Sequence, residues 1–298
     1  MRPPILFFVL DAFTDTRFAG NPAGVFLDDA AWLSPDEMRR LAGEVSLESA
    51  FVLPGDAACD LRLRYFTGVA EVPLCGHATV SALVALAHAG RVPGEGALRL
   101  RTPVGVLRAA LSANGANVTL FQNLPERGAP LDEAASREVL AALGCSRDAR
   151  LPLQVVSTGS PFLFVPVADR ASVEGTDRRD REALARLCRR HEALGVYVFA
   201  VEPDGDGIAT WGRCFAPAVG LDEDPVTGSA SGALGGYLAQ HGALTPDPSG
   251  TARFTARQGF AGGRGGSVGV EICLIDAQVT SVSITGSAVL VAEGAFRV

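Results

Sequence analysis

The sequence predicts an α+β protein made of two similar lobes, each a curved mixed β-sheet or barrel around a central apolar helix. An internal repeat is the first reason: the segment 71–90, EVPLCGHATVSALVALAHAG, matches the segment 223–242, EDPVTGSASGALGGYLAQHG. Each copy has a turn with proline, a Gly, a polar residue and a helically spaced apolar run that ends at Gly. Segments of alternating polarity, typical of strands, surround both copies. We therefore expect one lobe at 1–122, joined by the last strands at about 281–298, and a second lobe at 123–280.

The composition excludes several classes of function. The net charge of −7 argues against nucleic acid or an anionic membrane as the main partner. Every basic residue is an arginine, so the chain has no lysine for a Schiff base or a Walker-type phosphate loop. The six cysteines are scattered and contain no Cys-x-x-Cys, which argues against a zinc site or a disulfide framework and fits a reducing cytoplasm. We expect no metal and no cofactor.

The first elements are predicted from local signals. The apolar run at 5–12 is too short for a signal or membrane helix and is expected to form a buried strand. A loop over 14–23 contains Asn21 in a turn. The sequence Ser-Pro-Asp-Glu at 34–37 combines an N-cap, a proline at the first helical position and a capping box, so a helix should run to about Glu44.

A short strand is predicted over 46–53, SLESAFVL, and it contains one charged residue, Glu48. Alternation places Glu48 on a face with small side chains. A solvated edge position is the ordinary explanation for such a glutamate. The small neighbours instead favour a carboxylate that faces an enclosed cleft.

The remaining elements repeat this plan in both halves. A charged segment at 123–131, with Pro and Gly, is predicted to link the lobes. The segment 258–266, QGFAGGRGG, is expected to be a loop, because it lacks the strand–GxGxxG–helix context of a dinucleotide site. Further strands are expected at 60–67, 97–101, 105–111, 118–122, 151–157, 162–167, 196–201, 208–215, 251–258, 268–275, 279–285 and 288–291, and helices at 132–143 and 180–191.

The two repeated helix starts are candidate binding elements. Gly76–His77 and Gly228–Ser229 supply the first free backbone N–H groups of their helices, and such an end attracts an anion. Ordinary capping of two core helices is the simpler explanation. The long paired match favours two helix starts that face one another across a cleft between the lobes.

Six stretches carry a resemblance to a known family: DAFTDTRFAGNPAGV at 11–25, SLESAFVLP at 46–54, RYFTGVAEVPLCGHAT at 64–79, STGSPFLFVPV at 157–167, RCFAPAVGLDEDPVTGSA at 213–230 and QGFAGGRGG at 258–266. Together they resemble the phenazine-biosynthesis isomerase family, the PhzF-like proteins, within the diaminopimelate-epimerase-like fold. The resemblance implies a cofactor-free isomerase that moves a proton, usually as a cytoplasmic homodimer in a biosynthetic process. The chain departs from the family at two places. The family often has a His after Gly-Ser-Ala, where this chain has Ser231–Gly232, and it often has Thr-Pro where this chain has Thr67–Gly68. These departures bear on the identity of the substrate more than on the type of reaction.

The resemblance also implies the site residues. Glu48 matches the family's catalytic glutamate and His77 the histidine of its Cys-Gly-His-Ala-Thr motif. The chemistry agrees, since moving a proton beside a carboxylate needs a positioned general base. A histidine at a helix start is favoured as a neutral imidazole that donates or relays a proton. The catalytic candidates are Glu48, His77 and Asp224, and the substrate-binding candidates are Asn21, Gly76, Gly228 and Ser229.

Alternatives remain open. A racemase with two facing cysteines is disfavoured, because the position equivalent to Cys75 is Thr227. An epimerase or dehydratase of an amino or hydroxy acid that pairs Cys75 with another base stays the main alternative. A carboxylate-binding protein without catalysis is the third, and the combination of Glu48, His77 and Asp224 argues against it.

Overall fold

The chain divides into two compact units, each with several strands around a central helix. A computed structural model describes residues 2–177, 180–205 and 207–298. The first unit contains Met1–Phe121 and Thr285–Val298, and the second contains Gln122–Ile284. No helix in the described part of the chain is both long and apolar enough to cross a membrane.

Seven strands of the first unit and the part of β17 from Thr285 onward form a closed ring, in the order β1, β2, β3, β4, β6, β7, β8 and β17, which returns to β1. Neighbouring strands are antiparallel in most pairs, but β2 with β3 and β4 with β6 are parallel. Each parallel pair needs a crossover, and helices supply both. The elements are β1 Ile5–Ala12, β2 Asn21–Leu27, α1 Pro35–Val45, β3 Ser49–Asp56, β4 Cys59–Phe66, β5 Glu71–Val72, α2 Gly76–His88, β6 Gly96–Thr102, β7 Gly105–Ser112, β8 Asn117–Gln122 and β17 Gln278–Phe296.

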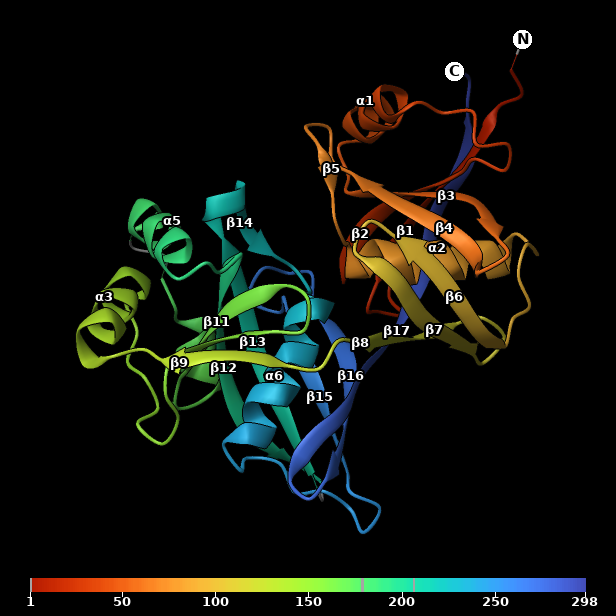
Figure 1. The fold of residues 1–298 in the computed structure, drawn as a ribbon. Coiled ribbons are helices and arrows are strands. Elements are labelled where there is room, and N and C mark those ends of the chain that lie inside the picture. The colour runs from red at the N-terminus through yellow and green to blue at the C-terminus, as the bar shows by residue number, and fades with distance from the viewer. Residues whose placement is uncertain (1, 178–179, 206) are drawn as a thin grey trace. The chain divides into compact units, whose positions relative to one another are not determined.

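The helix α2 lies inside this barrel, against β1, β2 and β3 (Figure 1). Nearly all of its residues from His77 to Leu86 are buried, so the helix is buried around its whole circumference, as expected of a central helix. The other crossover helix, α1, covers the outside and shares a core cluster with β2 and β3. Ser34 and Glu37 form the predicted capping box at its start.

The second unit has the same plan. Its strands pair in the order β9, β10, β11, β12, β13, β15 and β16, with parallel pairs β11–β12 and β13–β15. The helix α6 packs against β10, β11 and β16, while α3 and α5 lie side by side on another face (Figure 1). The elements are β9 Glu126–Pro130, α3 Glu133–Leu143, β10 Gln154–Ser157, β11 Pro161–Pro166, α4 Arg170–Glu174, α5 Arg181–Arg190, β12 Gly195–Asp204, β13 Gly207–Ala216, the 3-10 turn η1 Pro217–Val219, β14 Leu221–Asp224, α6 Gly228–Gln240, β15 Thr251–Gln258 and β16 Gly266–Ile275.

The internal repeat appears as matching structure in the two units. The helices α2 and α6 are each 13 residues long and begin at the two repeated glycines. Before each helix, an arginine makes a two-pronged ion pair with the repeated glutamate: Arg64 with Glu71, and Arg213 with Glu223. The duplication therefore extends from the helices to the polar contacts that hold the turns before them.

Four expectations about elements were wrong in detail. Asn21 is the first residue of β2 and does not lie in a loop. The expected linker contains β9, an exposed strand whose side chains show no apolar alternation. The last two predicted strands are one continuous strand, β17. Glu48 lies just before β3, because Ser46 ends α1 in a left-handed conformation (φ 53°) and pairing with β4 begins only at Ser49.

Candidate functional site

The start of α2 is held by a buried hydrogen-bonded chain. Cys75 is the N-cap residue, and its carbonyl oxygen accepts hydrogen bonds from the backbone N–H of Thr79 at 3.0 Å and from its Oγ1 at 2.7 Å. The hydroxyl of Tyr65, on β4, lies 2.7 Å from the same Oγ1. Burial raises the pKa of Tyr65 well above its ordinary value, so this phenol stays neutral. Together β4 and α2 fix the backbone that carries Cys75 and His77.

Three polar side chains converge at this helix start. The Sγ atom of Cys75 lies 3.3 Å from Oε2 of Glu48 and donates to it. The same sulfur lies 3.5 Å from Nδ1 and 3.6 Å from Nε2 of His77. Nε2 of His77 is 3.5 Å from Oε2 of Glu48. A carboxylate, a thiol and an imidazole are thus within proton-transfer or metal-binding range of one another.

The backbone also fixes Glu48, although this residue lies outside the strand. Its carbonyl oxygen accepts a hydrogen bond from the N–H of Gly24 on β2 at 3.1 Å. Its side chain is 42% exposed, whereas the side chain of His77 is 10% exposed. The cluster is therefore closed on the side of His77 and open to solvent on the side of Glu48, which is where a small molecule can approach.

Asn21 lies on β2, the strand that also binds the backbone of Glu48. It is 4% exposed and pairs with Ala12 across to β1. The loop before it is closed by Asp11, whose Oδ2 accepts a hydrogen bond from the N–H of Phe18 at 2.7 Å. Asn21 is thus a buried polar residue in the same unit as Glu48 and His77.

The second unit has its own polar cluster at the start of α6. Thr227 is the N-cap residue, and its hydroxyl donates to Oδ2 of Asp224 at 2.6 Å. The carbonyl oxygens of Gly228 and Ser229 accept hydrogen bonds from Gln122 at 3.2 Å and from Thr158 at 3.4 Å. Asp224, Gly228 and Ser229 therefore each accept a hydrogen bond near the start of α6, and the carboxylate of Asp224 is held by the N-cap residue Thr227.

Gln258 is a member of this second cluster that sequence reasoning did not select. It is 1% exposed, and its Oε1 accepts a hydrogen bond from the N–H of Thr227 at 3.0 Å. Its Nε2 donates to the carbonyl oxygen of Asp224 at 2.7 Å and to the hydroxyl of Thr227 at 3.0 Å. The one signal in the sequence is its position at the start of the QGFAGGRGG stretch, where the pattern predicts a loop.

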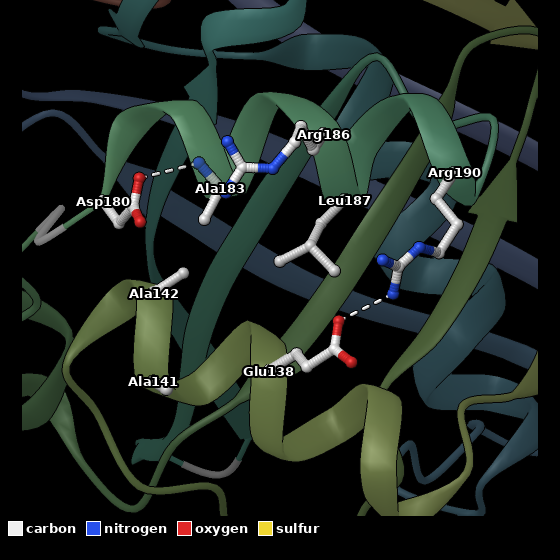
Figure 2. Close-up of a pocket in the computed structure, with 8 residues that line it drawn as sticks. All are labelled: Glu138, Ala141, Ala142, Asp180, Ala183, Arg186, Leu187 and Arg190. Atoms are coloured by element: carbon white, nitrogen blue, oxygen red, sulfur yellow. Dashed lines mark hydrogen bonds and ion pairs between the residues drawn. The ribbon is translucent and has the colours of Figure 1, made fainter.

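A pocket of about 410 Å³ lies elsewhere, between α3 and α5. Figure 2 shows charged side chains from both helices, including the ion pair of Glu138 with Arg190, together with Leu187 and alanines of the two helices. Asp180 faces its own helix and caps the N–H of Ala183. The pocket contains none of the predicted site residues.

Comparisons with known proteins agree with this fold. The PhzC-PhzF family model, described as phenazine biosynthesis-like protein, matches residues 10–294. An uncharacterized isomerase of Deinococcus radiodurans is 39% identical over 290 residues, covering 95% of this chain and 92% of that protein. The trans-2,3-dihydro-3-hydroxyanthranilate isomerase of Pseudomonas fluorescens is 34% identical over 244 residues, covering 80% and 81%.

Solved structures show the same similarity. A PhzF-family phenazine biosynthesis protein of Bacillus anthracis superposes with a TM-score of 0.86 at 30% identity, over 100% of both chains. A hydroxyproline epimerase of Agrobacterium vitis has a TM-score of 0.65 at 14% identity, over 99% of this chain and 91% of that one, which shows a shared fold.

Proposed function

Because this chain belongs to the phenazine biosynthesis-like (PhzC-PhzF) family and is an isomerase, we propose that it moves a proton on a small carboxylate-bearing substrate without a cofactor. The observation that carries the proposal is the convergence of Glu48, Cys75 and His77 at the start of α2. A cyclic, unsaturated acid is the substrate class we favour, since the Pseudomonas fluorescens relative is named for one.

Glu48 is the group that takes a proton from one carbon of the substrate and delivers a proton to another, and its partly exposed carboxyl group exchanges with solvent in between. A general base must reach the proton it removes, and Glu48 is the member of the cluster whose side chain is open to solvent. Removal and return by one carboxylate leave the composition of the substrate unchanged, as an isomerisation requires. The hydrogen bond from Cys75 orients the carboxylate before the substrate binds.

His77 has the second role in the proposal. Its imidazole is mostly enclosed and lies 3.5 Å from the carboxylate oxygen of Glu48, so it can donate a hydrogen bond to Glu48 or relay a proton. The free N–H groups at Gly76 and His77 belong to the first turn of α2, where the helix dipole favours the substrate carboxylate. Asp224, Gly228, Ser229 and Asn21 stay predicted members of the site, to be tested by substitution.

An epimerase that uses Cys75 is the second candidate, and one contact favours it. The thiol of Cys75 lies 3.3 Å from the carboxylate of Glu48, so the carboxylate can take up the thiol proton and leave a thiolate as the base. An epimerase removes a proton from one face of a carbon and delivers one to the other face, so its second proton carrier must lie across the substrate from Cys75 and is not Glu48. Substitution of Cys75 by serine separates the two candidates.

The test is turnover with trans-2,3-dihydro-3-hydroxyanthranilate, followed by absorbance and by NMR in deuterated water. The proposal expects isomerisation with deuterium incorporated at the carbon that receives the proton. If this compound is unchanged, a panel of unsaturated cyclic acids and of hydroxy and amino acids follows, again with deuterium incorporation as the readout. Deuterium at the α-carbon of a saturated acid, with inversion, would favour the epimerase instead.

A further inference from the structure

The three donors at the start of α2 have the spacing of ligands around one metal ion. Nε2 of His77, Sγ of Cys75 and Oε2 of Glu48 form a triangle with sides of 3.6, 3.5 and 3.3 Å. Zinc bonds of about 2.3 Å to sulfur and about 2.0–2.2 Å to nitrogen and oxygen, at tetrahedral angles, separate such ligands by about 3.4–3.6 Å. Each side of the triangle is within about 0.3 Å of that geometry.

We propose that Glu48, Cys75 and His77 form a binding site for one thiophilic divalent cation, with Zn²⁺ as the ion that fits best. The sequence expectation of no metal site was based on the absence of a local cysteine motif. The fold supplies the donor set in another way, because it brings Glu48 to a thiol and an imidazole that are two residues apart. Three protein ligands leave the fourth tetrahedral position open to water.

The donor types select the metal. Thiolate and imidazole favour Zn²⁺ and Co²⁺, whereas Mg²⁺ and Ca²⁺ prefer oxygen ligands alone. When the ion binds, a metal–sulfur bond replaces the S–H bond of Cys75, and the proton passes to solvent. The ion can enter from the side of Glu48, whose side chain is 42% exposed.

The site is largely formed in advance. The carbonyl of Cys75 is held by two hydrogen bonds from Thr79, which fixes the backbone of Cys75 at the start of α2. His77 is in the first turn of the same helix, so two of the three ligands share one rigid element. Only the side chain of Glu48 has to be ordered on binding, which keeps the entropic cost low.

The inference does not depend on the proposed function, since it concerns binding. If Glu48 and His77 do carry the proton transfer, an ion on both of them must block it, and the enzyme will be inhibited reversibly by Zn²⁺. Metal affinity and turnover are measured separately. A failure of the proposed metal site is therefore distinguishable from a failure of the proposed isomerase function.

The experiment uses the full chain, freed of metal with a chelator, and titrates it with Zn²⁺ by calorimetry and with Co²⁺ by absorbance. We expect one ion per chain and, with Co²⁺, a thiolate-to-cobalt charge-transfer band together with the strong visible bands of tetrahedral cobalt. Mg²⁺ at the same concentration should neither bind nor displace Co²⁺. Addition of a chelator should remove the bands.

Matched variants assign the ligands. Cys75→Ser, Glu48→Gln and His77→Gln should each weaken Zn²⁺ binding by about 100-fold or more, beyond the 10–100-fold typical of outer-shell changes. Cys273→Ser and His88→Gln change a thiol and an imidazole elsewhere in the chain and should bind as the parent does. Glu48 is partly exposed, so Glu48→Gln will fold even if a buried variant does not. Unchanged affinity in Cys75→Ser, or a cobalt complex without a thiolate band, would overturn the proposal.

Discussion

The thiol of Cys75 donates to the carboxylate of Glu48 across 3.3 Å, although the two residues are 27 positions apart in the chain. Glu48 comes from the segment between α1 and β3, and Cys75 caps α2. The contact is buried on the thiol side and open on the carboxylate side. It gives Cys75 a polar partner, which packing alone would not require.

Cys75→Ser distinguishes the two proposed functions. A serine hydroxyl can make the same hydrogen bond to Glu48, so an isomerase with Glu48 as its proton carrier should retain most of its turnover. An epimerase that uses the thiol as an acid or base should lose about 10²–10⁴-fold in kcat, because a serine hydroxyl gives up its proton far less readily than a thiol does. The measurement is kcat for parent and variant, with thermal unfolding as the control for folding.

Glu223→Gln tests the repeated ion pair in the second unit. Arg213 and Glu223 form two hydrogen bonds of 2.8 Å with side chains only 11% and 18% exposed. Replacing the carboxylate leaves a mostly buried guanidinium without its counter-charge, and we expect a loss of about 1–3 kcal/mol in the free energy of unfolding. Glu71→Gln is the matched control in the first unit, where the glutamate is 33% exposed, and it should cost less. Equal losses in urea unfolding would contradict this ranking.

Stability should depend on pH through His241. Burial, and next the charge of Arg127, lowers the pKa of His241 below its ordinary value of 6.5. In the folded chain its ring nitrogen Nε2 lies 2.8 Å from Oε1 of Gln154. Because the unfolded chain takes up this proton more readily, the contribution of His241 is fully present above the ordinary pKa and is lost as the pH falls through the folded value.

His241→Gln isolates this effect. Between about pH 7 and 5, the parent should lose more unfolding free energy than the variant, in which this titration is absent. Urea unfolding at several pH values measures the difference, and His88→Gln, which changes an exposed histidine, is the control. If the unfolding free energies of the parent and His241→Gln change with pH in the same way, His241 is not the source of the pH dependence.

The fold was predictable where the signal is local or repeated. The capping residues Ser34 and Asp132 mark the starts of α1 and α3, because side-chain caps depend on neighbours three residues away. The match between α2 and α6 was visible because duplication preserved both glycines. In contrast, β9 is an exposed strand without alternation, and the continuity of β17 depends on its partners in the fold.

The site was predictable only in part, for the same reason. Glu48 and His77 were selected from motifs, and the structure brings their side chains to 3.5 Å. The contact of Cys75 with Glu48 and the hydrogen bonds of Gln258 to Asp224 and Thr227 join distant segments, so no spacing in the sequence reveals them. The roles of Glu48, His77 and Cys75 in turnover stay predictions.

Glu48→Gln tests the central claim most directly. The amide keeps the shape of the side chain but cannot take up a proton, so turnover and deuterium incorporation should fall by about 10²–10⁴-fold while substrate binding and the unfolding temperature stay near the parent values. Glu44→Gln changes an exposed glutamate on α1 and should be fully active. The measurement is solvent deuterium incorporation into a substrate that the parent isomerises, compared for the three proteins. A Glu48→Gln variant that exchanges at the parent rate would contradict the assignment of Glu48 as the proton carrier.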